Sequence, residues 1–457
     1  MNIWINKNSS DLPDKNFDNA YIFSLNRKGY STIFTNLSDT WLRLGALSIE
    51  SIYEDLFIIA LSIFAIDKRI SRSKFKDCWT RELKVSIPVI EFDKWTSIAK
   101  KWNELLCFLT GDIWELSFRK TNNIYSLRTK HSRIKLDING CNSVCLFSGG
   151  LDSFCGAIKL LEQGDSPCLF GHNEYPKLRK KQNDLAAMFR EEYKEQTAKF
   201  LSFTANSRAP ENSQGKLTGS ENTSRGRSLL FLCAALTIAN IIGNDIPVYI
   251  PENGFIGLNI PLTDSRKGSC STRTTHPYFL KCFKLILENV GIKNPILNPF
   301  AFFTKREIVD SVKNTIAFKR GFADTISCSH PCNRGLNKYG VREYPLNCGY
   351  CYPCLIRKSS LLDVDTSSER YWMKDISLKF FNDFSNSDII NDSIAVINSV
   401  YRYRHITDDE IRRLIRCTTG NLSTEEINEF LRVYKKTMED LVELFANDSR
   451  LKRYIGL

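Results

Sequence analysis

The stretch from Ser148 to Ser153 carries the residue types best suited to holding a phosphate in this 457-residue chain. Its residues are Ser148, Gly149, Gly150, Leu151, Asp152 and Ser153. Glycines let a backbone approach phosphate oxygens, hydroxyls donate hydrogen bonds to them, and a carboxylate faces a bridging magnesium ion or fixes the loop. We therefore expect an anion-binding loop. A serine-capped turn without a ligand is the alternative that Ser-Gly-Gly alone leaves open.

The segments on either side of this loop are those that a phosphate-binding loop needs. The apolar run 144–147 predicts a strand, and Phe154, Ala157, Ile158 and Leu161 recur at helical spacing. The first amides of such a helix point at an anion, and the helix dipole favours it. The whole string resembles the PP-loop of the ATP pyrophosphatases, which cleave ATP between its α and β phosphates. The Gly-Lys-Ser/Thr ending of a Walker A loop is absent, which argues against a γ-phosphate kinase or motor.

Three cysteines separated by two-residue gaps form the second informative pattern. Cys348, Cys351 and Cys354 stand around Gly and Pro residues, the knuckle pattern in which thiolates converge on one tetrahedral zinc ion. The candidates for the fourth ligand are Cys328, Cys332 and, less favoured, His330. Four protein ligands close a zinc site, so we expect a structural zinc. A chance cluster of thiols and an iron–sulfur cluster are the alternatives.

Imidazole and guanidinium groups stand near other predicted strand and helix ends. His172 ends the predicted strand 167–172, where it is expected to contact the nucleotide or to serve as a structural hydrogen-bonding group. Arg225 and Arg227 precede the apolar, and hence buried, helix 229–236. Since the helix dipole already makes that end positive, we expect an anion beside the arginines; a solvated pair is the alternative.

A group of candidate substrate contacts follows. Glu252 stands at the carboxyl end of the predicted strand 247–251. Arg273 and His276 lie close to a predicted helix start, where they are expected to receive an anionic substrate or to close over the site as a lid. Thr275 as a plain helix cap is the competing interpretation.

Lys305 is the last candidate for contact with the pyrophosphate. It follows Thr304, which forms a capping box with the Glu three residues on, so a purely local role is the alternative. Two more capping boxes begin at Thr407 and Ser423. The amphipathic stripe 427–445 is expected to pack on the body of the protein rather than to bind a partner.

Strands that alternate with helices after the loop predict an α/β fold with a doubly wound parallel sheet, in which ligands lie at the carboxyl ends of strands. We expect three parts: an N-terminal α+β domain over 1–140, a PP-loop ATPase domain with the cysteine zinc site over 141–362, and a helical segment over 363–457. Residues 207–224, rich in Asn, Ser and Gly, predict a mobile loop.

The N-terminal part carries no recognisable catalytic motif. Its periodicity predicts helices over 49–66 and 92–109 and strands over 82–89 and 113–119. These patterns do not reveal the role of the N-terminal part. Docking of a partner and service as a lid over the site are the two roles considered.

Composition describes a protein with substantial cores and a basic surface. With 42% hydrophobic residues and 12% aromatic ones, the chain can fill two or three domains. No signal peptide or membrane-spanning run is visible, and 15 cysteines without a secretory signal favour reduced thiols, so a cytoplasmic location away from membranes is expected. The formal charge of +12 suits nucleic acid, nucleotides or an acidic partner, but decides little by itself.

The loop and the cysteine triplet together resemble the 7-cyano-7-deazaguanine synthases, the QueC family, over about residues 143–362. In that family a Ser-Cys precedes the triplet and an Arg follows it; Ser327-Cys328 and Arg357 match, which favours Cys328 over Cys332 as the fourth ligand. Gly226 and Arg227 match the family's Pro-Gly-Arg-Asn. The spacing from Cys328 to Cys348 is longer than the family's, and the flanking segments resemble the enlarged QueC-like proteins of antiphage operons, the QatC type.

The resemblance implies a ligase that uses Mg-ATP. A carboxylate, 7-carboxy-7-deazaguanine or a similar molecule, attacks the α-phosphate, and an amine then converts the acyl adenylate to an amide; the synthase uses ammonia twice and ends at the nitrile. The loop holds pyrophosphate and Mg²⁺, and Arg227 and Lys305 stabilise charge on the phosphates. Glu252, Arg273 and His276 contact the substrate. The extra segments point to an amine on a partner protein as a further acceptor.

Two other functions compete with this interpretation. A tRNA-modifying PP-loop enzyme, of the thiolase or lysidine synthase type, draws on the basic charge, and salt-sensitive tRNA binding would favour it. A non-catalytic, zinc-stabilised scaffold of a defence complex would keep its biological activity after loss of Asp152.

Overall fold

The computed structural model describes most of the chain. The described residues are 1–8, 10–25, 31–196, 198–221, 223, 225–260, 273–331, 344–373, 387–420 and 422–457, with the backbone alone at 387–391. Cys332 and the polar stretch 264–272 lie outside them, so the structure tests no expectation about these residues.

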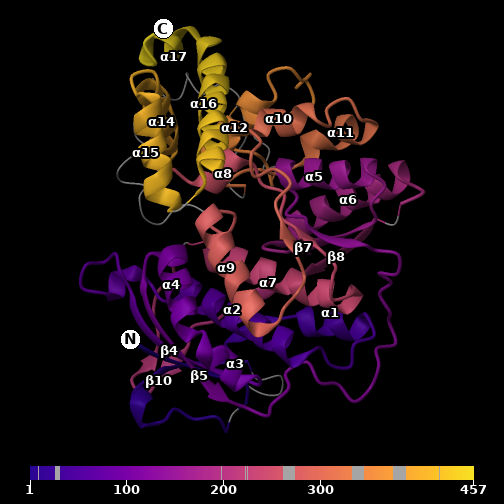
Figure 1. Ribbon diagram of the computed structural model, residues 1–457, viewed down its shortest axis with the longest axis vertical. Helices are drawn as coiled ribbons and strands as arrows, with labels where there is room; N and C mark the ends of the chain where they lie inside the picture. Colours follow the sequence, from indigo (N-terminus) through magenta and orange to yellow (C-terminus); the bar gives the residue numbers. More distant parts are fainter. Residues whose placement is uncertain are drawn as a thin grey trace.

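A five-stranded parallel sheet lies at the centre of the molecule (Figure 1). Its strands are β6 (Ser143–Leu146), β7 (Pro167–His172), β8 (Lys199–Phe203), β12 (Val248–Tyr249) and β13 (Ile296–Leu297). They are ordered β13-β12-β6-β7-β8, and every neighbouring pair is parallel. The chain therefore adds β7 and β8 on one side of β6 and then β12 and β13 on its other side. This reversal between β6 and β12 is the place where open α/β sheets leave a crevice for a ligand.

Helices cover both faces of this sheet because its strands are apolar on both sides. On β6, Val144 and Leu146 join one core while Cys145 and Phe147 join another. The helices are α5 (Leu151–Glu162), α6 (Pro176–Glu192), α10 (Lys305–Asp310) and α11 (Ile316–Gly321) on one side, and α7 (Arg225–Ile242) and α9 (Pro277–Val290) on the other. The expected α/β class with a parallel sheet is confirmed.

The N-terminal residues form a second sheet, drawn in indigo and violet in Figure 1. Its principal strands are β1 (Asn2–Asn6), β2 (Tyr21–Ser24), β4 (Glu82–Val89) and β5 (Ile113–Lys120), and its helices are α1 (Leu37–Arg43), α2 (Ser51–Arg69), α3 (Phe92–Ser97) and α4 (Ala99–Thr110). The predicted strands and the helix predicted over 49–66 are confirmed, whereas the helix predicted over 92–109 is divided at Ile98 into α3 and α4. These four strands are parallel to their neighbours, unlike the segregated α+β arrangement that we expected. Helix pairs make the crossovers from β2 to β4 and from β4 to β5, whereas a loop with the turn η1 (Lys15–Phe17) connects β1 to β2.

The two sheets share one hydrophobic core. Helix α2 packs along α7, and one continuous cluster of buried side chains runs from Ile3 of β1 through both helices to Val144 of β6. The remaining short elements are β3 (Ile33–Thr35) and the 3₁₀ turns η1 (Lys15–Phe17), η2 (Arg72–Lys74) and η4 (Phe322–Asp324).

The stretch 207–224, predicted as a mobile loop, begins with the last residue of β9 and contains two further short strands, so that prediction is wrong for its first half. β9 (Ala205–Ser207) pairs with β3, while β10 (Glu211–Asn212) and β11 (Gly215–Lys216) form a hairpin on the edge of β2. Composition gave no signal for this, since the pairing uses backbone groups of a strand about 190 residues earlier, as in the contact between Glu211 and Ile22.

Helices of the C-terminal part stand together at one end of the molecule, in yellow in Figure 1. They are α14 (Ser387–Tyr403), α15 (Asp408–Thr419), α16 (Thr424–Ala446) and α17 (Ser449–Tyr454), and they cover α8 (Gly254–Leu258) and α12 (Tyr352–Ser360). The capping boxes at Thr304, Thr407 and Ser423 are confirmed. The stripe of α16 is buried in a core shared with Phe255 and Leu355, so its packing on the body is confirmed.

Among the described residues, one helix has the length and apolarity to cross a membrane. This helix is α7, and 67% of its apolar window is buried inside the protein. A buried core helix passes the same test of length and composition, so this is weak evidence for a membrane span.

Gly254 provides a test of the packing between the central sheet and the C-terminal helices. A Cβ at Gly254 would lie 2.1 Å from the carbonyl oxygen of Ala301 and 3.3 Å from Val433, whereas a Cβ at Gly257, in the same helix, would make ordinary contacts. We expect Gly254→Ala to lower the free energy of unfolding by about 1–3 kcal/mol, the usual cost of overpacking. Gly257→Ala is the control. Equal denaturation midpoints for the two variants would contradict this packing.

Candidate phosphate-binding loop and cysteine cluster

The loop between β6 and α5 has a glycine in a left-handed conformation and two serine hydroxyls that lie close together. Gly149 has φ +84°, a conformation that favours glycine, and a Cβ there would lie 3.2 Å from Gln182. The Ser148 and Ser153 hydroxyls lie 3.2 Å apart, and the Gly150 amide donates to the Ser148 hydroxyl at 3.3 Å. Both hydroxyls therefore stand at the start of α5, at the carboxyl edge of the sheet, as the sequence predicted.

Asp152 connects the ends of three neighbouring strands. Its Oδ2 accepts hydrogen bonds from the side-chain amide of Asn253, at 2.7 Å, and from the Asn253 backbone, at 3.3 Å. Its Oδ1 is paired with the ammonium group of Lys305, whose side chain is only 7% exposed. Asp152 follows β6, Asn253 follows β12 and Lys305 follows β13. The structure therefore brings together Asp152 and Lys305, two residues 153 positions apart that the sequence assigned to one site.

Glu252 lies beside this ion pair. Its carboxylate accepts a hydrogen bond from the Thr275 hydroxyl, and its backbone is held by Asn298. Burial raises the pKa of Glu252 to about 7, and the nearby Asp152 carboxylate acts in the same direction, while the Thr275 hydroxyl and the Lys305 ammonium oppose the shift. Glu252 is thus a carboxyl group that changes charge near neutral pH at the edge of the site.

Arg227 and His172 stand at the carboxyl end of the neighbouring strand β7. Arg227, in the first turn of α7, is partly exposed and paired with Glu174. His172 packs among aromatic rings, with its ring centre 4.9 Å from that of Phe203 and 6.4 Å from that of Phe64. Burial lowers the pKa of His172 to about 3, helped by the positive charge of Arg227, so its imidazole is neutral at physiological pH.

The imidazole Nε2 of His172 is buried without a hydrogen-bonding partner in the part of the chain that the structure describes. A buried polar atom of this kind is uncommon in folded proteins. His172 ends β7, the strand next to β6, and its ring contacts are with Phe64, Phe203 and Phe231 rather than with the loop.

Arg273 and His276 lie against α4. The Arg273 guanidinium donates to the carbonyl of Phe108 at 2.6 Å, and the His276 ring stands 4.9 Å from the Phe108 ring. His276 caps α9, since its Nδ1 accepts a hydrogen bond from the Tyr278 amide at 3.2 Å, and burial lowers its pKa to about 3. The competing interpretation of Thr275 as the cap is wrong: its hydroxyl serves Glu252 instead.

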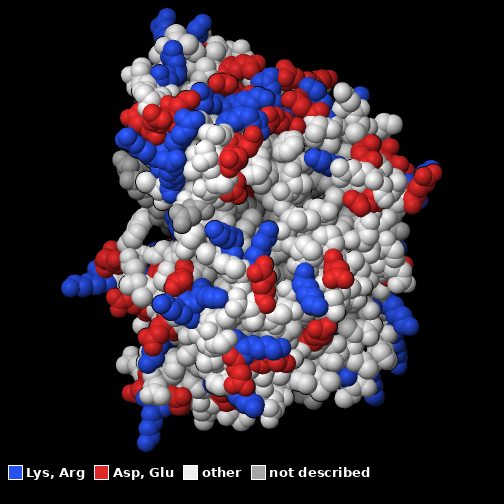
Figure 2. Space-filling view, viewed as in Figure 1, with Lys and Arg blue, Asp and Glu red and all other residues white. Residues whose placement is uncertain are grey.

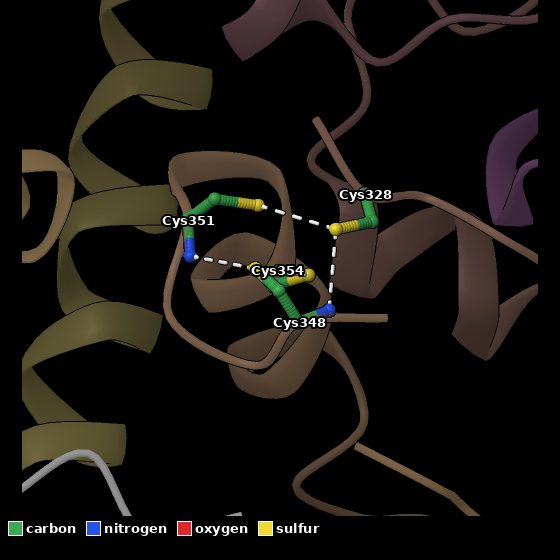
Figure 3. A group of neighbouring side chains, drawn as sticks. All are labelled: Cys328, Cys348, Cys351 and Cys354. Atoms are coloured by element: carbon green, nitrogen blue, oxygen red, sulfur yellow. Dashed lines mark hydrogen bonds between the residues drawn. The ribbon is translucent and has the colours of Figure 1, made fainter. Parts of the chain in front are cut away.

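Four cysteines converge on one point (Figure 3). They are Cys328, Cys348, Cys351 and Cys354, and their sulfur atoms all lie within 4.8 Å of one another. Cys328 and Cys351 are 3.9 Å apart and Cys348 and Cys354 3.8 Å apart, against about 3.8 Å for the edge of a tetrahedron with zinc–sulfur bonds of about 2.3 Å. The donor set and spacing fit a closed, structural zinc site, and Cys328 supplies the fourth thiol.

Backbone amides support the thiols of this cluster. The amides of His330 and Cys348 both point at the Cys328 sulfur at 3.2 Å, and the Cys351 amide points at the Cys348 sulfur at 3.3 Å. Such N–H groups orient the sulfur atoms toward their common point, as hydrogen bonds around metal ligands do. Gly349 is required between them, because it has φ +89° and a Cβ there would lie 2.0 Å from the Met373 carbonyl oxygen.

Ser327 connects the cysteine cluster with the loop between β6 and α5. The Ser327 hydroxyl accepts a hydrogen bond from the Leu151 amide at 3.2 Å, and the Arg357 guanidinium lies 3.3 Å from it. Arg357 is fully buried, pairs with Glu369 and also donates to Thr325 at 2.6 Å. The helix that carries Cys354 therefore also fixes the first turn of α5, so loss of the metal is expected to disturb the loop.

Sequence reasoning missed some residues of the site. Asn253 and Gln182, which donates from its side-chain amide to the carbonyls of Phe147 and Ser148, were not singled out. The only signal was the place of Asn253 at a strand end. No protein-family model matches the chain, and no curated protein matches it either.

Removing one thiol tests the metal site. We expect Cys354→Ser to lower bound zinc well below one atom per chain and to lower the thermal midpoint by roughly 5 °C or more, since metal binding and folding are coupled. Atomic absorption and calorimetry measure the two effects. Cys417→Ser, at an exposed thiol, is the control. Wild-type protein that takes up no zinc when folded would contradict the assignment.

Glu252 gives a pH-dependent test. Its folded pKa of about 7 is above the ordinary glutamate value of 4.5, so the stability that comes from its protonated form is present below pH 4.5 and is lost as the pH rises through about 7. Glutamine mimics the neutral form at every pH. We therefore expect Glu252→Gln to gain thermal stability relative to the wild type at pH 8 and to lose that advantage near pH 5. Glu195→Gln, at an exposed carboxylate, should show no such trend.

Proposed function

We propose that this chain is an ATP-dependent ligase of the PP-loop type, which adenylates a deazaguanine-type carboxylate and passes the acyl group to an amine. The observation that carries the proposal is the buried Asp152–Lys305 pair beside the two serine hydroxyls, at the reversal point of a parallel sheet. A buried ion pair is weak evidence for stability, because desolvation offsets its attraction. Its place at a ligand crevice supports a role in binding charge.

The first step is a displacement at the α-phosphorus of ATP. A carboxylate oxygen of the substrate bonds to that phosphorus, the bond to the β-phosphate bridging oxygen breaks, and pyrophosphate leaves with the electron pair. The amides at the start of α5 and the hydroxyls of Ser148 and Ser153 hold the leaving pyrophosphate. Lys305 moves its ammonium from Asp152 to the phosphates, and Arg227 adds positive charge from the adjacent strand end.

Mg²⁺ would neutralise part of the phosphate charge when bound. The oxygen donors suited to it are the Asp152 carboxylate, freed as Lys305 turns to the phosphates, and the serine hydroxyls. The zinc implied by the cysteines is assigned a structural role, since four thiols leave no position for a substrate.

In the second step an amine nitrogen bonds to the acyl carbon, the bond to the AMP oxygen breaks, and the nitrogen loses a proton. Glu252, whose pKa of about 7 suits proton acceptance at neutral pH, is the carboxylate next to the site. Arg273 and His276 remain expected substrate contacts, and their assignment depends on a substrate that reaches the start of α9. The amine is ammonia or belongs to a partner protein, as the resemblance implies.

Surface charge gives less support to a tRNA substrate. On the face shown in Figure 2, Lys and Arg side chains alternate with Asp and Glu rather than gathering in one stripe. The excess of 63 basic over 51 acidic residues thus forms no single stripe on this face, and the ligase remains the proposal.

The reaction itself provides the test. Protein incubated with Mg-ATP, ammonia and 7-carboxy-7-deazaguanine is expected to form AMP and pyrophosphate, and Lys305→Ala and Asp152→Asn each to lower that rate about 100-fold, the usual loss for one preorganised charge contact. Lys313→Ala is the matched control, since Lys313 follows α10 and pairs with Asp310 at the end of that helix rather than with Asp152. Chromatography of the nucleotides measures the products.

Formation of ADP and phosphate would contradict the PP-loop chemistry. Zinc-loaded, folded protein that forms no AMP with this carboxylate would contradict the substrate. A defence function that survives Asp152→Asn would favour the scaffold.

A further inference from the structure

Helix α16 lies against α10, the short helix that begins with Lys305 (Figure 1). α10 has only six residues, Lys305–Asp310. A helix of this length has few hydrogen bonds of its own, so its position depends on the elements packed against it. The direction in which Lys305 projects is therefore set largely by the partners of α10.

Arg306 attaches one side of α10 to α16. Its guanidinium Nη1 lies 3.0 Å from Asp440 and 2.6 Å from Glu443, both on α16, and its Nε lies 3.1 Å from Asp363. The residue directly after Lys305 thus holds two carboxylates of the C-terminal helix.

Glu307 makes the opposite contact. Its Oε1 receives Arg432 at 2.7 Å and Lys436 at 2.8 Å, while its Oε2 completes the capping box with Thr304. The basic residues of α16 face the acid of α10, and the acids of α16 face its arginine. Sliding the two helices past each other would place like charges together, so the pattern selects one register.

The same helix also supports the second partner of Asp152. Asn253 caps α8, and Gly254, the next residue, lies close to Val433 of α16. The ring of Phe255 stands 5.6 Å from the ring of Tyr434. Both elements that deliver a side chain to Asp152 therefore rest on α16.

We infer that α16 is a positioning element for the phosphate site: it fixes α8 and α10 so that Asn253 and Lys305 meet at Asp152. Each of these ion pairs has one side chain that is at most 22% exposed and so held in place, and four such pairs along one contact fix the position of α10 on α16. A displacement of about 1 Å at a reacting group is enough to slow a reaction strongly. The catalytic part of the inference rests on the proposed ligase activity; the positioning of Lys305 does not.

Amine labelling of Lys305 tests the positioning without any assay of activity. In the zinc-loaded chain of 457 residues, Arg432→Ala/Lys436→Ala removes both cations from Glu307. We expect a limiting N-hydroxysuccinimide ester of acetic acid to acetylate Lys305 about fivefold faster. The reason is that losing two ion pairs raises the population of molecules with a displaced α10 by roughly that factor. Peptide mass spectrometry reads the modified site.

The matched control is Arg412→Ala/Lys435→Ala. It removes the same charges, from partners Asp409 and Asp408 on α15. Acceleration in the first variant alone supports the inference, whereas equal labelling of Lys305 in both variants overturns it. Arg306→Ala, which releases Asp440 and Glu443, is the second variant and should accelerate labelling as well.

Kinetics separate positioning from simple destabilisation. If the proposed ligase reaction is present, Arg432→Ala/Lys436→Ala should lower kcat about fivefold with little change in the KM for ATP, and Arg432→Lys/Lys436→Arg should restore kcat. A wild type without activity refutes the proposed function, and labelling alone then decides the inference. An active wild type with unchanged kcat in the double variant overturns the catalytic part.

Discussion

The Asp152 carboxylate holds the site together. One oxygen binds Lys305 and the other binds Asn253, so a single side chain at the start of α5 connects the segments that leave β6, β12 and β13. Two of these contacts span more than 100 residues, and both lie at the point where the order of the parallel strands reverses. A carboxylate in such a place is costly to bury without partners, and Lys305 and Asn253 are its partners here. In the proposed reaction a phosphate takes the place of the carboxylate as the partner of Lys305.

Two other parts of the molecule hold the residues around Asp152 in place. The cysteine cluster acts through Ser327 and Arg357 on the first turn of α5, and α16 acts through α8 and α10 on Asn253 and Lys305. The N-terminal sheet shares its core with α7, the helix that presents Arg227. Segments whose sequence shows no catalytic motif therefore still determine the geometry of the site.

Patterns that depend on near neighbours could be predicted from the sequence. The strand, loop and helix around Ser148, the capping boxes and strand β4 are of this kind, because periodicity and capping are local. The cysteine triplet fixed three members of its cluster, and the preceding Ser-Cys indicated Cys328.

Long-range contacts could not be predicted. The pairing of the hairpin β10–β11 with β2, the role of His276 as a helix cap and the hydrogen bond from Asn253 to Asp152 each depend on where distant segments meet. His172 shows the same limit: its place at a strand end suggested a nucleotide contact, whereas the aromatic rings around it come from α2, α7 and β8.

The position of a bound nucleotide tests the central claim most directly. A crystal structure of the zinc-loaded protein with Mg²⁺ and an ATP analogue that resists cleavage between the α and β phosphates would show it. We expect the β and γ phosphates to contact the amides at the start of α5 and the hydroxyls of Ser148 and Ser153, with Lys305 turned from Asp152 towards them. A nucleotide bound elsewhere, with the Asp152–Lys305 pair intact, would contradict the account.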